Sequence, residues 1–262
     1  MDDRLIFISD LLKSVSKKIA KKNYVSSDAS YSYKKGYLAE EDLFANDYIC
    51  DAINEEFPNE QIFSEEGDSE FSISKNEDCW IIDPICGTTN FVKGFPFYVH
   101  SVCFMHRGAV THAGIFAPSL NELFLADENV STLNGSIISV SNVETLEESL
   151  ISINCNQSDY STSDYSIDSI VNILKPPISR RLHIIESANL ELAYVACGRL
   201  DAYVNPHDKI WDIAAGSLLI QSAGGSSIKL KKSKKKLTKD YIGVIGANKY
   251  LLDPIKDILL NS

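Results

Sequence analysis

Acidic residues at three places in the sequence could together hold a cation. The pair Glu65-Glu66 precedes a predicted strand, Asp83 ends that strand, and Asp212 lies at the predicted start of a helix. A carboxylate at a buried strand end costs free energy unless a cation or hydrogen-bond donors compensate its charge. At a helix N-terminus, partial positive charge stabilises an anion. Taken singly, each acid also fits an N-cap or a strand-end turn, so the acids alone do not define a site.

The segment 83–91 (DPICGTTNF) adds a phosphate-binding element to these acids. Gly87 permits a tight turn, and Thr88, Thr89 and Asn90 would present amides and hydroxyls just beyond the strand end. A turn of this kind that opens a helix can bind phosphate. Carboxylate, hydroxyl and carbonyl oxygens are also the ligands that magnesium prefers. The combination therefore predicts metal-assisted attack of water on phosphorus.

Three motifs in a fixed order give the chain a resemblance to the inositol monophosphatase family. That family carries an acidic pair, then D-P-[IL]-D-G-T-[TS]-N-F, then W-D-x-A-A-G. This chain carries Glu65-Glu66, DPICGTTNF at 83–91 and WDIAAG at 211–216, and LNELFLAD at 120–127 resembles the family's PxxNELF strand. The likeness runs from the first predicted helix to residues 247–248, so it covers essentially the whole chain.

The resemblance implies a fold. The expected architecture is α+β or α/β, a layered αβαβα sandwich of the inositol monophosphatase and fructose-1,6-bisphosphatase type. Residues 1–147 would form an N-terminal α+β half that holds an antiparallel sheet and the metal-site motifs. Residues 148–262 would form a C-terminal α/β half that contributes the Trp-Asp motif. Because relatives are commonly homodimers, the resemblance also implies a homodimer.

The resemblance further assigns metal ligands for a magnesium-dependent phosphoric monoester hydrolase. Glu65 and Asp83 would bind a first Mg²⁺ ion, together with the carbonyl of Ile85. Asp83 would bridge to a second Mg²⁺ ion, which Asp212 would also hold. The reaction would be a direct in-line displacement, in which the metals stabilise charge on the attacking and leaving oxygens.

Two residues would be catalytic by the same resemblance. Thr88 would orient the attacking water, paired with Asp42 on the helix before the acidic pair. Asp42 could equally be an exposed helical carboxylate beside two glutamates. Gly87 and Thr88 would offer backbone amides to the phosphate. The implied substrate-binding residues are Cys86, Gly87, Thr88, Ser187, Ala188, Asn205 and Asp212.

Cys86 departs from the family pattern, which has a second aspartate at this position. A cysteine is a soft ligand, poorly matched to magnesium, and is a neutral thiol unless its pKa is depressed. We therefore expect the second metal site to be weaker, differently occupied or lost. A nucleophilic role for Cys86 is disfavoured because residues 86–93 contain no arginine. A redox role stays open, since a thiol beside metal-bound charge is a target for oxidation.

Two further departures concern the substrate. Asn205 replaces an acidic residue that contacts inositol in animal relatives, and Glu186 occupies the first position of a segment that is commonly Gly-Ser-Ala. The expected substrate is a small phosphorylated metabolite, an inositol monophosphate or a related sugar or polyol phosphate. Alternatives are 3′-phosphoadenosine-type nucleotidase and fructose-1,6-bisphosphatase-like activities. A different class also stays open, a catalytically weakened phosphatase-fold protein that binds a partner.

Hydrophobic patterns predict the elements that would position these residues. Helices are expected at 5–22, 40–57, 187–197 and 212–223, the third capped by Ser187 and followed by Gly198, the fourth opened by Asp212. Strands are expected at 61–66, 78–83, 98–106, 109–116, 122–127 and 150–154, with the middle ones in an antiparallel meander. Residues 23–36 are expected to form a polar loop or hairpin.

Composition limits the remaining possibilities. Apolar residues make up 44% of the chain, and no run is long enough to span a membrane. The net charge of −11 disfavours nucleic-acid partners. Six cysteines without a CxxC pair argue against a zinc ribbon or a disulfide framework. Asp2 and Asp3 do not fit a secretory signal, so a cytoplasmic location is expected. The basic run 229–239 (KLKKSKKKLTK) predicts either a solvated turn or a docking surface for a polyanion.

Overall fold

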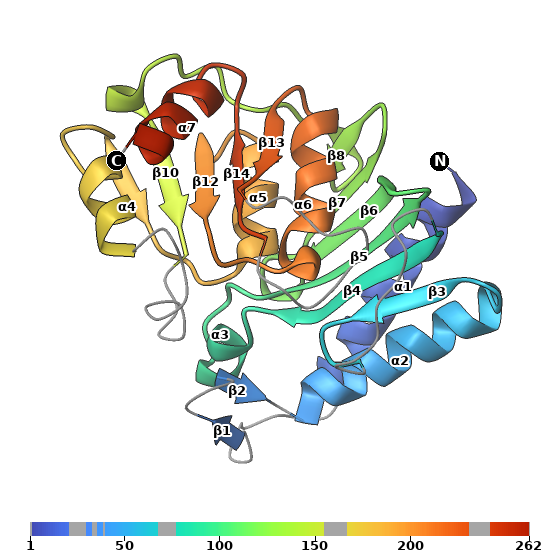
Figure 1. Ribbon diagram of the computed structural model, residues 1–262. Helices are drawn as coiled ribbons and strands as arrows, with labels where there is room; N and C mark the ends of the chain where they lie inside the picture. The colour runs from blue at the N-terminus through green and yellow to red at the C-terminus, as the bar shows by residue number, and fades with distance from the viewer. Residues whose placement is uncertain are drawn as a thin grey trace.

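The computed structural model describes residues 2–20, 30–32, 36–38, 40–67, 77–154, 167–230 and 242–261 (Figure 1). The basic run lies outside these residues from position 231 onward. Of the predicted loop at 23–36, the described part contains β1 (Ser30–Ser32), which pairs antiparallel with β2 (Gly36–Leu38). The described helices are all too short or too polar to cross a lipid bilayer.

The larger sheet has seven strands in the order β3-β4-β5-β6-β7-β8-β9. β3 pairs parallel with β4, and every other neighbouring pair in this sheet is antiparallel, as the predicted meander requires. The strands are β3 (Gln61–Ser64), β4 (Cys79–Cys86), β5 (Val99–His106), β6 (Ala109–Ala117), β7 (Glu122–Asp127), β8 (Ser131–Leu133) and β9 (Ser136–Ile137).

The smaller sheet has five strands in the order β11-β10-β12-β14-β13. β10 pairs parallel with β11 and β12, whereas β14 pairs antiparallel with β12 and β13. The strands are β10 (Leu150–Ile153), β11 (Arg181–His183), β12 (Ala202–Asn205), β13 (Ser226–Lys229) and β14 (Val244–Ala247).

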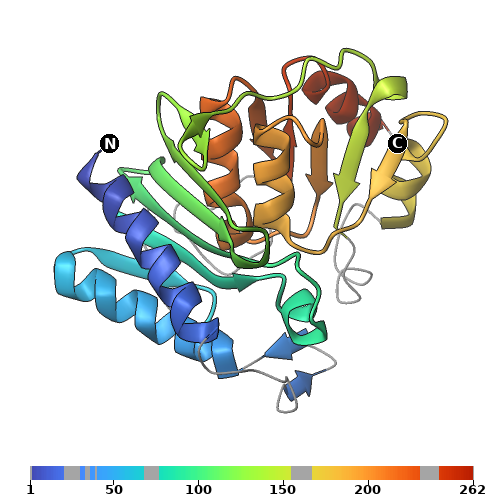
Figure 2. The same cartoon turned by 180° about the vertical axis from the view of Figure 1, so that it is seen from behind.

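Helices form three layers around the two sheets (Figures 1 and 2). One pair covers the outer face of the larger sheet, a second lies between the sheets, and a third covers the outer face of the smaller sheet. These pairs are α1 (Asp3–Ala20) with α2 (Glu40–Glu56), α5 (Ala188–Ala196) with α6 (Ile210–Ser222), and α4 (Ile167–Leu174) with α7 (Leu252–Asn261). The predicted αβαβα sandwich is confirmed.

Each layer forms because its apolar residues match the faces that the layering buries. In α1, Leu5, Ile8, Leu12 and Val15 recur at helical spacing and are all buried against the larger sheet. β4 is covered on both faces, and all eight of its residues are buried. In the middle layer, a Cβ at Gly216 would lie 2.4 Å from the Cβ of Leu192. The glycine of the WDIAAG motif thus allows α6 to pack closely against α5.

Several predicted boundaries differ from the structure by one to three residues, and two of them concern β4 and α6. The strand predicted to end at Asp83 continues to Cys86, because Pro84 lies in a register shift where it need not donate a ladder hydrogen bond. The helix predicted to open at Asp212 begins at Ile210, with Lys209 as its N-cap. The predictions for the preceding helix are confirmed, since Ser187 is its N-cap and Gly198 has a φ of +73°.

Candidate active site

The turn after β4 joins the strand to α3 (Thr88–Lys93), and glycine is required at its centre. Gly87 has a φ of +91°, in the left-handed region that disfavours other residues. A Cβ at this position would also lie only 2.9 Å from the carbonyl oxygen of Phe97. Close packing by neighbouring segments therefore leaves no room for a side chain in the turn, at the point where the resemblance assigns phosphate binding.

His100 supports the strand just before this turn, a role that sequence analysis missed. Between Asp83 and Cys86, two residues of β4 face His100 of β5 across a bulge. The buried His100 Nδ1 lies 2.6 Å from the carbonyl oxygen of Pro84. Burial lowers the pKa of His100 to about 4, so the ring is neutral and Nδ1 carries the proton that it donates. The imidazole thus replaces a ladder hydrogen bond next to Ile85.

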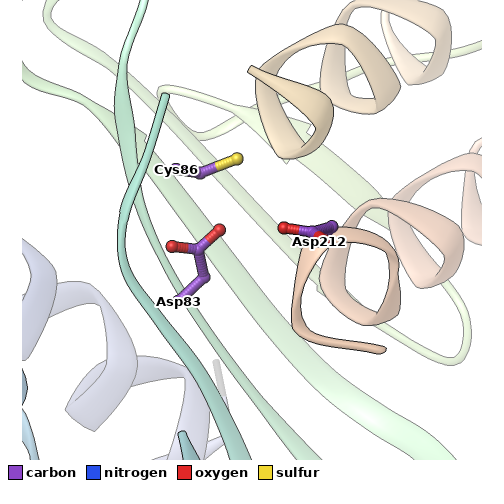
Figure 3. A group of neighbouring side chains, drawn as sticks. All are labelled: Asp83, Cys86 and Asp212. Atoms are coloured by element: carbon purple, nitrogen blue, oxygen red, sulfur yellow. The ribbon is translucent and has the colours of Figure 1, made fainter. Parts of the chain in front are cut away.

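Asp83, Cys86 and Asp212 converge on one point between β4 and the start of α6 (Figure 3). One ligand atom from each lies within 4.8 Å of the other two. Asp83 is 1% exposed and Cys86 5% exposed, whereas Asp212 is half-buried. The Asp212 carboxylate also accepts a hydrogen bond of 2.8 Å from the backbone N–H of Lys209, which fixes it in the first turn of α6.

Asn189, in the first turn of α5, holds two members of this cluster. Its side-chain amide donates to Oδ2 of Asp83 at 3.3 Å and to the carbonyl oxygen of Trp211 at 2.9 Å. Its backbone N–H donates to Sγ of Cys86 at 3.4 Å. A single residue of the middle layer therefore connects the strand that carries Asp83 with the helix that carries Asp212.

The neighbouring carboxylates of the site would be stabilised by a bound cation. Burial, followed by the charges of Glu65 and Asp212, raises the pKa of Asp83 well above its usual range. Burial and the charge of Asp212 raise the pKa of Glu65 to about 8. Oδ1 of Asp83 is buried and has no hydrogen-bond partner within the described residues. A divalent cation among these carboxylates would restore their ionised forms, so the oxygen ligands fit the magnesium that the family implies.

Cys86 does not fit magnesium in the same way. Burial, with Asp83 and Asp212 nearby, raises the pKa of its thiol well above the usual value. Without a cation, Cys86 is therefore a protonated thiol, which is a poor nucleophile. Magnesium gains little from a sulfur ligand, so this side of the cluster is less suited to it than the Glu65 side.

Thr88, the first residue of α3, lies beside Asp42 of α2. The Thr88 hydroxyl is 3.4 Å from Oδ1 of Asp42 and 3.0 Å from the carbonyl oxygen of Ile85. Its single proton can be donated to one of these acceptors at a time. Asp42 is 2% exposed, so it is not the exposed helical carboxylate that the sequence also allowed.

The segment before α5 places Ser187 and Ala188 beside the turn. The Ser187 hydroxyl donates to the carbonyl oxygen of Cys86 at 3.0 Å, and Ala188 is buried. Glu186 has a φ of +64°, which suits the glycine that the family commonly has there. The carboxylate of the buried Glu191 accepts hydrogen bonds from the N–H groups of Ile185 and Ser187.

Asn205 lies at the end of β12 with its side chain engaged within the protein. Its amide donates to Asp208 at 2.6 Å, and its oxygen accepts from the N–H of His207 at 3.0 Å. Tyr203 also donates to Asp208. Burial and the charge of Asp212 raise the pKa of Asp208 well above its usual range, so a further acid that the sequence did not suggest faces the cluster. The substrate contact of Asn205 stays a prediction.

Comparisons with known proteins agree with this fold. The model of the inositol monophosphatase family matches residues 4–257. An inositol monophosphatase of Dictyostelium discoideum is 33% identical over 233 residues, 86% of this chain and 84% of that protein. The solved structure of a Thermotoga maritima IMPase has a TM-score of 0.85 and 31% identity, covering 99% of this chain and 98% of that one.

The layered fold with its carboxylate cluster defines a protein of the metal-dependent phosphatase type. This chain belongs to the inositol monophosphatase family, with Cys86 in place of the second aspartate of the DPxDGT motif. Its relatives carry names of two kinds. A Xylella fastidiosa protein that is 34% identical over 190 residues, 72% of this chain and 67% of that protein, is named Nus factor SuhB.

Proposed function

We propose that the chain is a magnesium-dependent phosphomonoesterase that hydrolyses a small phosphorylated metabolite, an inositol monophosphate or a related sugar or polyol phosphate. The observation that carries this proposal is the convergence of mutually repelling acids beside the glycine turn that opens α3. Glu65 and Asp83 have raised pKa values, and both face Asp212. Such an arrangement is costly unless a bound cation compensates it.

Glu65, Asp83 and the carbonyl of Ile85 would hold magnesium on one side of Asp83. Asp212 and Cys86 each place a ligand atom within 4.8 Å of a ligand atom of Asp83. Bound magnesium would neutralise phosphate charge and make water more acidic. Asn189 and His100 keep this ligand set in place, since they bind Asp83 and the carbonyl of Pro84.

Thr88 and Asp42 would act on the water. When the Thr88 hydroxyl donates to Asp42, its lone pairs are free to accept a hydrogen bond from water positioned in line with phosphorus. Gly87 and Thr88 would donate backbone N–H groups to the phosphate at the start of α3. Asp42 is buried, so its carboxylate is held near Thr88 rather than released into solvent.

The residues beside the turn bear on the substrate. Ser187 contacts the turn, and Glu186, whose carbonyl oxygen lies beside Gly87, adds a negative charge next to it in the chain. That charge favours a substrate whose part outside the phosphate is uncharged, such as a polyol. A relative from Thermotoga maritima, 37% identical over 192 residues that cover 73% of this chain and 70% of that protein, is named fructose-1,6-bisphosphatase/inositol-1-monophosphatase. Bisphosphorylated sugars and 3′-phosphorylated nucleotides therefore belong in the substrate panel.

A second candidate function is binding of a partner by a phosphatase fold with weak catalysis. Cys86 favours it, because the thiol replaces a metal-binding carboxylate. The relatives named Nus factor SuhB also favour it. The predicted homodimer and cytoplasmic location are compatible with either function.

Phosphate release from a panel of inositol, sugar and nucleotide phosphates would test the proposal. The native chain and Cys86→Asp should be compared at equal concentration, with and without Mg²⁺. We expect Mg²⁺-dependent turnover by the native chain, with one substrate class clearly preferred. Negligible turnover on every substrate, together with activity in Cys86→Asp, would contradict it and favour the binding protein.

A further inference from the structure

The three residues that meet at Cys86 form a mixed ligand set. Asp83 supplies a carboxylate from β4, Cys86 a sulfur from the same strand, and Asp212 a carboxylate from the first turn of α6 (Figure 3). Their ligand atoms lie within 4.8 Å of one another. In a tetrahedral zinc site with Zn–S and Zn–O bonds of about 2.3 and 2.1 Å, ligand atoms lie about 3.5 Å apart. Small side-chain rotations would bring the three atoms to that spacing.

The chemistry of this set differs from that of the family. Magnesium prefers six oxygen ligands and retains water, so a thiol in place of a carboxylate weakens its binding. Zinc and cobalt bind thiolate and carboxylate together, often through three protein ligands with a fourth position left open. The substitution therefore changes which cation this position selects.

Two observations support the binding of an ion by Asp83, Cys86 and Asp212. Asp83 is 1% exposed, and its Oδ1 has no hydrogen-bond partner among the described residues, although the Cys86 thiol interacts with the Asp83 carboxyl group. Asn189 fixes both neighbouring ligands, because its side chain donates to Asp83 and its backbone N–H donates to Cys86 Sγ. Hydrogen bonds of this kind orient metal ligands and stabilise sulfur as a thiolate.

We propose that Asp83, Cys86 and Asp212 bind a zinc-type cation, one of borderline softness such as Zn²⁺ or Co²⁺, in preference to a second magnesium ion. On binding, the Cys86 thiol gives its proton to solvent, and the freed electron pair forms the bond from sulfur to the metal. No group is oxidised or reduced. This proposal rests on the proposed function in one respect only. Asp83 would bind both the zinc-type cation and the magnesium ion that Glu65 holds.

Cobalt titration of the full chain in saturating Mg²⁺ would test this, because a cobalt–thiolate bond gives a charge-transfer band in the near ultraviolet. We expect one Co²⁺ per chain with this band, displaced by Zn²⁺. Cys86→Ser should lose the band and bind Zn²⁺ roughly tenfold or more weakly in calorimetry. The other five cysteines (Cys50, Cys79, Cys103, Cys155 and Cys197) remain in every variant and control for unrelated thiols.

The outcomes separate the two proposals. An unchanged band in Cys86→Ser, or no band in the native chain while Mg²⁺ supports phosphate release, would overturn the zinc-type site and leave the proposed function intact. A band that depends on Cys86 in a chain without turnover would support the site and count against the phosphatase. Asp212→Asn gives a second check, since it keeps the sulfur but should weaken Co²⁺ binding.

Discussion

The backbone N–H of Asn189 lies 3.4 Å from Sγ of Cys86, and the side chain of the same residue donates to Asp83. The first turn of α5 is therefore fixed to β4 at the position where this chain departs from its family. The cysteine is part of a connected set of contacts rather than an isolated replacement. We therefore expect Cys86 to change which cation binds as well as the rate of catalysis.

Asp83→Asn should separate activity from stability. We expect activity to fall on the order of 10³-fold, because the variant loses a carboxylate shared by both cation positions. The metal-free protein should be at least as stable as the native chain, since burial raises the pKa of Asp83 and makes its charge costly. Thermal unfolding with and without Mg²⁺ would show this, with exposed Asp51→Asn as the control. A large loss of stability without metal would contradict the interpretation.

Thr88→Ala should lower kcat by about 10²–10⁴-fold with little change in KM, because it removes the hydroxyl that we propose orients water. Thr88→Ser keeps a hydroxyl within reach of Asp42 and should retain most of the rate. Steady-state kinetics of the two variants with the preferred substrate would measure the difference. Equal losses in both variants would mean that the methyl group, rather than the hydroxyl, matters.

Glu186 combines a strained backbone with a charge, and two substitutions separate these effects. Left-handed conformation costs a non-glycine residue about 1–2 kcal/mol, so Glu186→Gly should raise the melting temperature by about 2–8 °C. Glu186→Gln keeps the φ of +64° and should not raise it. Both variants should lower KM for anionic substrates, since both remove the charge. Identical melting temperatures would argue against backbone strain.

Glu191 should make stability depend on pH. Burial raises its pKa from 4.5 to about 7, so the native state holds this proton more tightly than the unfolded chain. The contribution of Glu191 to the free energy of unfolding is complete below pH 4.5 and is lost as pH rises through about 7. Relative to Glu191→Gln, the native chain should lose about 3 kcal/mol between these limits. Urea unfolding of both proteins at pH 5 and pH 8 would measure this loss of stability. Parallel pH profiles of the two proteins would refute the prediction.

His100 should influence magnesium binding without touching the ion. His100→Leu removes the donor to the Pro84 carbonyl, leaves that buried oxygen unpaired at a cost of about 1–3 kcal/mol, and frees the bulge beside Ile85. We expect weaker Mg²⁺ binding in calorimetry. His100→Asn places an N–H near the same oxygen and should restore much of the affinity. Unchanged Mg²⁺ affinity in His100→Leu would mean that the bulge is held by other contacts.

The layered fold was predicted through the family resemblance that the three motifs carry, whereas residue type and position singled out Asp83 and Asp212. The predictions for these two residues depend on local patterns, an apolar run ending in an acid and a helix start. The continuation of β4 to Cys86 was not predictable, because Pro84 signals a strand end unless the bulge opposite His100 is known. Asn189 was missed for a related reason, since its contacts join segments more than a hundred residues apart in sequence.

Mg²⁺-dependent phosphate release from an inositol monophosphate, by the native chain beside Asp83→Asn, tests the central claim most directly. We predict turnover that requires Mg²⁺, stops when the metal is chelated, and is lost in Asp83→Asn. Absence of turnover by the native chain at any Mg²⁺ concentration, on this substrate and on the rest of the panel, would contradict the assignment as a phosphatase.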